Sequence, residues 1–373
     1  MKLSTQASFG SRGEPFVALL ERTLDDGVFG IRSLGAEIQA ITRIRIGERL
    51  VAVHPDEVYV PAELGFLREG DMVRLNPFSG EARVLYRKQS RHNFLFFTER
   101  CNSRCLMCSQ PPREVDDDYL VGDILRMIPW MAKETPELGI TGGEPTLLHG
   151  KLLEVIESIK RHLPATSLHM LSNGRLLSYL RYAERIAGVG HPDFMIGIPL
   201  YADTAGLHDF VVQAKGAFEQ TIHGILNLGR VGVRVELRMV IHRETYARLP
   251  QFARFVARNL PFVTQVVLMG LEIMGYTRSN LDALWIDPVD YQDELEEAVN
   301  ILDGAGINVF IFNHQLCLLR PALHRFSRKS ISDWKNTYMP ECGSCLLKDE
   351  CGGFFASAHL RYSKHIKPFA MPC

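Results

Sequence analysis

Three closely spaced cysteines are the residues best suited to carry chemistry in this chain. Cys101, Cys105 and Cys108 follow an apolar segment, 93–98, with the spacing C-x3-C-x2-C. Three thiolates on one short loop can hold three corners of a [4Fe–4S] cube, whereas electron-transfer clusters normally use four cysteines. The next cysteine after Cys108 is Cys317, and a structural zinc site would need a fourth ligand. The spacing therefore predicts a cluster with one open iron, to which a small molecule binds.

Polar residues follow several apolar segments farther along the chain. The run 142–145, Gly-Gly-Glu-Pro, follows the segment 138–141. Its glycines let the backbone approach a ligand closely, and Glu144 supplies a carboxylate for an ammonium group. Ser172 and Asn173 stand at the end of the segment 168–172, and Asp203 follows the next one. Asn-Gly is also a common turn dipeptide, so for these three residues the turn and the ligand site both stay open.

The cysteine motif and the Gly-Gly-Glu-Pro motif together resemble the radical S-adenosylmethionine (SAM) superfamily. The resemblance implies that SAM binds the open iron and that one electron cleaves it to a 5′-deoxyadenosyl radical, with Cys101, Cys105 and Cys108 as the catalytic cluster ligands. It also implies a set of residues around SAM: Met107, Gly142, Gly143, Glu144, Pro145, Ser172, Asn173, Asp203, Arg238 and Met269. Met107 stands where family members usually carry an aromatic residue beside the adenine.

Arg238 is a charge within an otherwise apolar segment, 235–241. A buried arginine needs a partner. The SAM carboxylate is one candidate, and Glu236, on the same face of the expected strand, is the other.

Strand and helix patterns alternate from residue 93 onward. Apolar runs predict strands at 94–98, 138–141, 168–172, 194–200, 235–241 and 266–269, and helices are predicted at 118–133, 147–162 and 246–259. Because the runs are largely apolar, they favour a parallel sheet covered on both faces. The fold class we predict is α/β, a partial (β/α)6 radical SAM barrel, the barrel being implied by the resemblance. Ligands of such sheets sit at the carboxyl ends of the strands.

Two further parts flank this predicted core of residues 93–282. Residues 1–92 are expected to form a small β-rich domain, in which the segments 71–75 and 82–86 flank a hairpin turn, 76–80. Residues 283–373 are expected to hold a helix at 288–303, a strand at 307–312 and a cysteine-rich iron–sulfur region. No catalytic constellation stands in residues 1–92.

The C-terminal cysteines suggest a second metal site. Cys342, Cys345, Cys351 and Cys373 are spaced C-x2-C-x5-C-x21-C, and Cys317 lies upstream. The pattern resembles the SPASM and twitch domains, which implies an auxiliary [4Fe–4S] cluster; a zinc ribbon is the competing interpretation. Phe355 stands where a full SPASM domain would carry another cysteine. We therefore expect one auxiliary cluster, with Cys317 and Cys373 as alternative fourth ligands.

Several other charged and histidine residues have structural interpretations. The acidic run 116–118 is expected to cap the helix that follows it. His208, Asp209 and His223 are expected to be ordinary surface or core residues. A basic stretch is expected to be a solvated face; it comprises Arg320, Arg325, Arg328, Lys329 and Lys335.

Composition narrows the protein class. The 373 residues are 46% hydrophobic and 23% charged, with a net charge of −1 and eight cysteines, as in ordinary globular proteins. The near-neutral charge argues against nucleic acid as a partner. The polar N-terminus and the absence of a long apolar run predict no signal peptide and no membrane partner. Clustered cysteines indicate metal binding in a reducing cytoplasm.

The run 101–112, the run 142–145 and the short Cys342-Gly-Ser-Cys345 motif look most like the His-Xaa-Ser system radical SAM maturases (HxsC type). This resemblance implies modification of a peptide or small protein with His-Xaa-Ser repeats. It also implies a companion radical SAM protein and an electron donor such as ferredoxin or flavodoxin. A radical SAM enzyme acting on a small molecule or RNA, and a non-catalytic iron–sulfur or zinc protein, remain alternatives.

Overall fold

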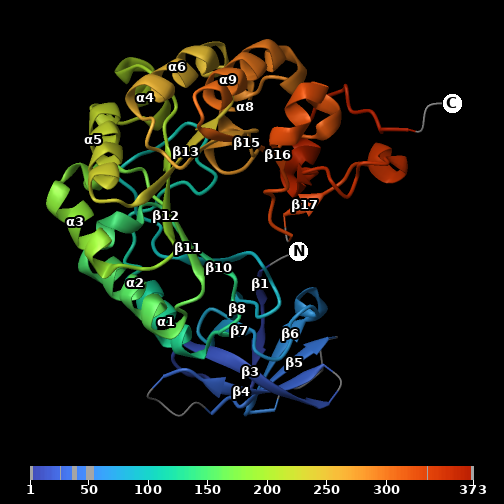
Figure 1. Ribbon diagram of the computed structural model, residues 1–373. Coiled ribbons are helices and arrows are strands. Elements are labelled where there is room, and N and C mark those ends of the chain that lie inside the picture. Colours follow the sequence, from blue (N-terminus) through green and yellow to red (C-terminus); the bar gives the residue numbers. More distant parts are fainter. Residues whose placement is uncertain (1–2, 26, 36–39, 48–53, 334, 371–373) are drawn as a thin grey trace.

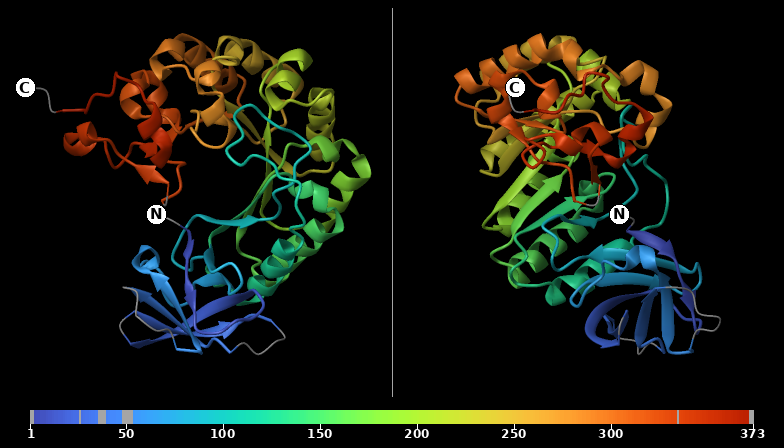
Figure 2. Two further views of the ribbon diagram at one scale, coloured as in Figure 1. Left: turned by 180° about the vertical axis from the view of Figure 1, so that it is seen from behind. Right: turned by 90° about the vertical axis from the view of Figure 1, so that its right-hand side faces the viewer.

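Two sheets organise the chain. The computed structural model describes residues 3–25, 27–35, 40–47, 54–333 and 335–370. An all-β region comes first, a helix-covered parallel sheet follows, and a C-terminal region of short elements comes last; together they form an open C (Figures 1 and 2). In the described part of the chain, no helix is both long enough and apolar enough to cross a membrane.

The N-terminal region is a small β-barrel. Its sheet has the strand order β1-β8-β7-β3-β4-β5-β6-β2. Only Ala7 separates β1 from β2, yet these strands lie at opposite edges of the sheet, so the chain closes the sheet on itself. The predicted hairpin is confirmed, because β7 and β8 pair antiparallel. The strands are β1 Ser4–Gln6, β2 Ser8–Phe9, β3 Phe16–Asp25, β4 Val28–Ser33, β5 Arg43–Gly47, β6 Glu57–Pro61, β7 Met72–Asn76 and β8 Glu81–Tyr86.

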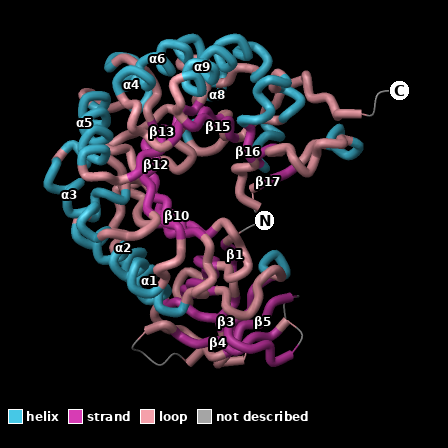
Figure 3. The backbone as a smooth tube through the Cα atoms, viewed as in Figure 1, coloured by secondary structure: helices cyan, strands magenta, loops and turns pink. Residues whose placement is uncertain are grey.

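The second sheet is parallel throughout, and its strands lie side by side in sequence order. The strands are β9 Asn93–Phe96, β10 Glu137–Thr141, β11 Ser167–Leu171, β12 Phe194–Pro199, β13 Arg234–Val240, β14 Gln265–Met269, β15 Asn308–Phe312 and β16 Ser327–Arg328. The sheet curves, with helices on its outer side (Figure 3). The predicted partial α/β barrel is confirmed. The strand predicted at 307–312 is β15, which with β16 continues the sheet past the six strands of the predicted core.

The helices are α1 Tyr119–Met127, α2 Gly150–His162, α3 Leu180–Val189, α4 Ala205–Val212, α5 Ala217–Arg230, α6 Leu249–Asn259, α7 Tyr276–Ser279, α8 Leu281–Leu284 and α9 Gln292–Gly304. Prolines set several boundaries. The predicted helix 118–133 ends its α-helical part at Met127, and a 3₁₀ turn, Ile128–Trp130, follows because Pro129 cannot donate a helical hydrogen bond. A 3₁₀ turn that starts at Pro288 likewise precedes α9.

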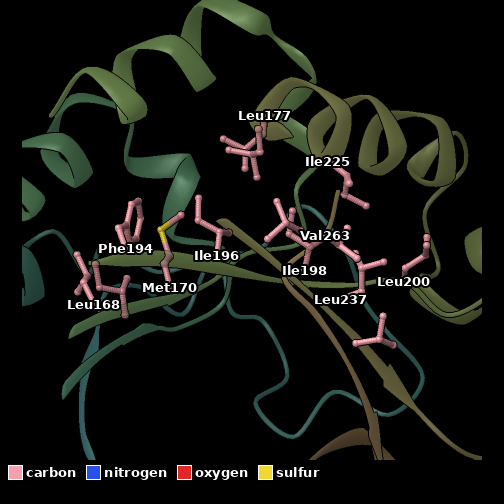
Figure 4. Close-up of a cluster of buried hydrophobic side chains, with 14 of the residues drawn as sticks. Leu168, Met170, Leu177, Phe194, Ile196, Ile198, Leu200, Ile225, Leu237 and Val263 are labelled. Carbon is pink, nitrogen blue, oxygen red and sulfur yellow. The ribbon is translucent and has the colours of Figure 1, made fainter. Parts of the chain in front are cut away.

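The main hydrophobic core lies between the sheet and its helices. Leu168, Met170, Ile196 and Ile198 of β11 and β12 belong to one buried cluster with Ile225 of α5 (Figure 4). Burial alternates along β11, because the other face of the strand points to the inside of the barrel. The strands β12, β13 and β14 contain runs of consecutive buried residues, so both faces of the sheet are buried there, as predicted, with the helices on the outer face.

Polar contacts join the β-barrel to the parallel sheet. The Arg74 guanidinium of β7 donates to the Asp123 carboxylate of α1 over 2.8 Å, and it lies over the Tyr119 ring at 4.3 Å. The Tyr86 hydroxyl and the Thr135 hydroxyl share a buried hydrogen bond of 2.7 Å. Both links are shielded from water, so they hold the two regions in one orientation.

We predict that replacing Arg74 with leucine loosens this interface. The Arg74 and Asp123 side chains are 15% and 8% exposed, so the variant leaves a buried carboxylate with only Arg126 as a charged partner. We expect the free energy of unfolding to fall by about 1–3 kcal/mol. Urea denaturation followed by tryptophan fluorescence measures this free energy.

Arg254→Leu is the control, because the Arg254–Glu297 pair is 56% and 51% exposed and should change stability by no more than about 0.5 kcal/mol. Equal effects would contradict the prediction.

Candidate metal and SAM site

The loop that carries Cys101, Cys105 and Cys108 has no regular secondary structure, so other segments satisfy its backbone. The Leu106 carbonyl accepts from the Asn280 side chain over 2.8 Å, and the Met107 carbonyl accepts from the Thr277 hydroxyl over 3.1 Å. These bonds connect the loop to the α7–α8 region. Sequence reasoning missed Thr277 and Asn280, because they stand about 170 residues away and belong to no motif.

Helix α4 supports the same loop from another side. The Arg104 amide donates to the Val212 carbonyl over 3.1 Å, and the Leu106 amide donates to the Val211 carbonyl over 2.9 Å. Met107 is 7% exposed and packs with Val211 in a small apolar cluster behind the loop. Its predicted place beside the adenine stays a prediction.

A buried carboxylate fixes the start of the loop. Asp117 is 3% exposed and accepts hydrogen bonds from the Thr98 hydroxyl and the Glu99 amide, and it pairs with the Arg100 guanidinium at 2.9 Å. Asp118 occupies the N-cap position of α1, but its side chain makes no capping bond and pairs with Arg100 instead. The prediction that the acidic run caps the helix with its side chains is therefore wrong. The run holds the segment just before Cys101.

The two glycines of the Gly-Gly-Glu-Pro run lie against the loop itself. The Gly143 amide donates to the Thr98 carbonyl, and the Glu144 amide donates to the Arg100 carbonyl over 2.9 Å. A Cβ at Gly143 would stand 2.1 Å from the Arg100 carbonyl oxygen, and Gly142 has a φ of +148°. Glycine is therefore required here so that two backbone segments can touch, in addition to any approach to a ligand.

Glu144 lies at the centre of the site. It is fully buried, and its oxygens accept from the Thr146 amide and hydroxyl, the Ser172 hydroxyl and the Asn173 amide. Burial raises the pKa of the Glu144 carboxyl, and these hydrogen bonds oppose the rise. The carboxylate thus joins the end of β10 to the end of β11, and Pro145 begins a buried 3₁₀ turn, Pro145–Leu148. Its predicted contact with the SAM ammonium stays a prediction.

The structure brings Ser172 and Asn173 into the site beside the first cysteine. The Asn173 side-chain amide lies 3.9 Å from the Cys101 sulfur and donates to the Asn102 side chain over 2.6 Å. Arg175 reaches the same loop, where it donates to the Asn102 carbonyl and, over 3.1 Å, to the Ser103 hydroxyl. Sequence reasoning missed Arg175, although it directly follows the Asn-Gly pair.

Three other predicted SAM contacts already have partners within the chain. Asp203 accepts two hydrogen bonds from the Arg248 guanidinium, at 2.8 and 2.6 Å. Arg238 donates to the Glu236 carboxylate over 3.0 Å and lies 3.4 Å from the Met269 sulfur. Of the two partners considered for Arg238, Glu236 is therefore the one in contact. Burial alone would raise the pKa of Glu236, but His169, Arg238 and Gln265 lower it to about 2.

The loop cysteines fit the [4Fe–4S] cluster that the motif implies. Burial, followed by the charge of Glu144, raises the pKa of the Cys101 thiol to about 11. Burial also raises the pKa of Cys105 and Cys108, and the charges of Cys101 and Cys108 raise that of Cys105 further. As thiolates these cysteines would repel one another, and bound iron would relieve that repulsion.

The described C-terminal cysteines and Cys317 share one small pocket. Cys317, Cys342, Cys345 and Cys351 line it together with Tyr338 and Phe354. Burial raises the pKa of Cys317, and the charges of Cys351 and Cys342 raise it further. Cys373 lies outside the described residues. Among those described, no three histidine, cysteine or acidic side chains converge tightly enough for a single metal ion. A site at these four cysteines is therefore a proposal based on their shared pocket.

The remaining candidates have structural roles. His208 is 1% exposed, accepts from the Tyr201 amide over 3.2 Å and stacks on the Tyr201 ring; burial lowers its pKa to about 4. Asp209 accepts from the Gly216 and Phe218 amides, and His223 lies exposed on α5. The structural interpretation of these residues is confirmed.

The basic stretch is largely paired within the chain. Arg320 pairs with Asp293 and Glu296, Arg325 pairs with Asp303, and Lys335 pairs with Glu272. Arg328 lies over the Phe310 ring, and Lys329 donates to the Asp349 carbonyl. These residues cover the chain's own acidic and aromatic groups.

Comparison with known proteins agrees with this geometry. Residues 95–256 match the Radical SAM superfamily model, so this part of the chain is a radical SAM domain. The chain is 27% identical over 166 residues to a pre-heme d1 synthase of Dinoroseobacter shibae and 29% identical over 152 residues to a GTP 3′,8-cyclase of Petrotoga mobilis. The first match covers 42% of this chain and 38% of the relative, and the second covers 39% of this chain and 45% of the relative. The chain therefore spans less than half the length of each relative.

Two solved structures align with part of the chain. SuiB of Streptococcus suis bound to S-adenosylmethionine aligns with a TM-score of 0.49 and 16% identity, over 60% of this chain and 50% of that chain. The enzyme anSMEcpe bound to AdoMet and the Cp18Cys peptide aligns with a TM-score of 0.48 and 12% identity, over 74% of this chain and 91% of that chain.

We predict that Gly143→Ala prevents cluster assembly. The new Cβ would meet the Arg100 carbonyl oxygen, a backbone atom that can give way only if the loop moves. After anaerobic reconstitution, the iron bound at the loop should fall several-fold relative to wild type. Gly150→Ala is the matched control, because a Cβ there meets nothing within 4 Å. Wild-type iron content in Gly143→Ala would show that the close approach is not needed.

Proposed function

We propose that this chain is a radical SAM enzyme that modifies a peptide or small protein with His-Xaa-Ser repeats. The proposal includes a cytoplasmic location, a companion radical SAM protein and a ferredoxin or flavodoxin as electron donor. The observation that carries the enzymatic part is the loop of Cys101, Cys105 and Cys108, held at the carboxyl ends of the parallel strands beside Glu144 and Asn173. The motif resemblance of the runs 101–112 and 142–145 supports the peptide substrate.

Different residues of the chain would have different roles at this site. Cys101, Cys105 and Cys108 would hold a [4Fe–4S] cluster, which with bound SAM supplies one-electron reductive cleavage and the hydrogen abstraction that follows. Glu144 and Asp117 keep the loop in place from two sides. The inner face of the sheet, where Arg238 and His169 are 20% and 16% exposed, would line the space for substrate. The curved sheet would keep bulk water from that space.

A small-molecule substrate is the second candidate. The two relatives named above are a pre-heme d1 synthase and a GTP 3′,8-cyclase, and neither name indicates a peptide. RNA is disfavoured, because the basic stretch 320–335 is engaged with groups of the chain itself.

We expect the reconstituted, dithionite-reduced protein to form 5′-deoxyadenosine from SAM under anaerobic conditions. Cys105→Ala should abolish this product, because the loop then offers only two thiolates. A synthetic peptide with three His-Xaa-Ser repeats should stimulate the reaction and change in mass. Cleavage without any change in the peptide would favour the small-molecule substrate. A fully iron-loaded protein that forms no nucleoside, even with the companion protein added, would contradict the enzymatic proposal.

We further propose that Cys317 completes a second [4Fe–4S] cluster with Cys342, Cys345 and Cys351. The Gln315 side chain donates to the Gly353 carbonyl over 2.7 Å, which ties the Cys317 segment to the Cys351 segment. The Tyr338 hydroxyl donates to the Cys351 carbonyl over 3.0 Å. Both bonds keep the pocket together before any metal binds.

Iron counting tests this ligand set. Wild type should bind about eight irons per chain, in two cubes, and Cys317→Ala about four. Cys373→Ala is the matched control and should keep the wild-type count. The opposite pattern would assign the fourth corner to Cys373, and bound zinc in place of iron would favour the zinc ribbon.

A further inference from the structure

Asn173 is fixed by the chain on every side. Its backbone amide donates to Glu144, and its carbonyl accepts from the Thr221 hydroxyl over 3.0 Å. Its side-chain oxygen accepts from the Arg175 amide over 3.0 Å. Because that oxygen is engaged, the orientation of the side-chain amide is set, and its nitrogen must face the cysteine loop.

The side-chain nitrogen has two hydrogens and two neighbours on the loop. One neighbour is the Asn102 side-chain oxygen, at 2.6 Å, and the other is the Cys101 sulfur, at 3.9 Å. Among the described residues, Cys101 is the only one of the three loop cysteines whose sulfur accepts a hydrogen bond from a side chain, while the Cys108 sulfur donates to the Gln110 carbonyl. The site is therefore asymmetric, with one sulfur placed against an oriented amide.

We propose that Asn173 donates an N–H···S hydrogen bond to Cys101 and thereby raises the reduction potential of the cluster on this loop. Reduction adds negative charge to the cluster and its sulfurs, and hydrogen bonds to those sulfurs stabilise that charge. Removing the donor would therefore make the cluster harder to reduce. This inference rests on the proposed function only in requiring a cluster on Cys101, Cys105 and Cys108.

The Glu144 carboxylate is a buried negative charge that lies next to Asn173. The buried negative charge of Glu144 would oppose the addition of an electron to a cluster on this loop. Glu144 is also the group that holds the Asn173 backbone in place. The buried carboxylate thus opposes electron uptake through its charge and supports it by positioning the amide. Asn173 is therefore a positioning residue. Its side chain contacts the sulfur of Cys101 and would tune the reduction potential of the cluster through that sulfur.

An EPR-monitored redox titration tests the proposal without any peptide. A Cys345→Ala/Cys351→Ala parent removes the second cysteine group, so that only the loop cluster contributes. Asn173→Leu, which keeps the approximate shape but has no donor, should shift the midpoint potential to more negative values. Asn173→Asp should shift it further, because a carboxylate then faces the sulfur. ENDOR spectra in H₂O and in D₂O identify exchangeable protons coupled to the cluster. One such proton should be present in the parent and absent in Asn173→Leu.

Asn308→Leu is the matched control. Asn308 is an exposed amide at the start of β15 that donates to the Thr264 carbonyl over 3.1 Å, and its loss should leave the potential unchanged. If Asn173→Leu fails to hold iron, Asn173→Ser replaces it with the same expected direction. An unchanged or more positive potential with full iron content would overturn the proposal. A wild-type loop that binds no iron would overturn it together with the proposed cluster, whereas a peptide that stays unmodified would count only against the proposed substrate.

Discussion

The buried carboxylate of Glu144 is the interaction on which the cysteine site depends. A carboxylate without contact to water is costly unless hydrogen-bond donors surround it, and four donors from Thr146, Ser172 and Asn173 do so here. Those donors come from the loops after two neighbouring strands. The carboxylate therefore fixes the spacing between the ends of β10 and β11. The cysteine loop rests on both ends, through the Gly143 amide and through Asn173.

A loop without secondary structure is held in place by groups from elsewhere in the fold. Its amides donate to α4, its carbonyls accept from Asn280, Thr277 and the Tyr276 amide, and its first residues are bound to Asp117. Because other segments approach the loop so closely, glycine is needed at two contact points, Gly143 and Gly275. A Cβ at Gly275 would stand 2.3 Å from the Cys108 carbonyl oxygen, as one at Gly143 would stand 2.1 Å from that of Arg100. Burial raises the pKa of all three thiols, and a bound metal would displace their protons.

Local sequence patterns were sufficient for the fold and for the residues directly at the strand ends. Apolar runs and helical periodicity predicted the alternating strands and helices, and the family resemblance implied the barrel. Motif spacing placed Glu144, Asn173 and the loop cysteines in one region. The sequence patterns did not predict the side-chain contacts that the fold creates between distant segments. Asp203 meets Arg248 because the segment after β13 lies beside the end of the neighbouring strand β12. The Arg238–Glu236 pair differs, because it joins two residues of one strand and was one of the two partners considered from the sequence. The acidic run has the composition of a helix cap, and only the three-dimensional arrangement shows that Asp117 turns toward Thr98 instead.

The positions of the two cysteine groups follow from the topology of the parallel sheet. The loop of Cys101 leaves the carboxyl end of β9, the first strand, and Cys317 follows β15, near the other edge of the same sheet. Parallel strands end at one edge of a barrel, so both groups lie on the side where ligands of such folds bind. Lys335 pairs with Glu272 after β14, which attaches the C-terminal region to this side. A substrate held along the inner face would therefore lie between the two groups, because the curvature of one continuous sheet places them at its opposite ends.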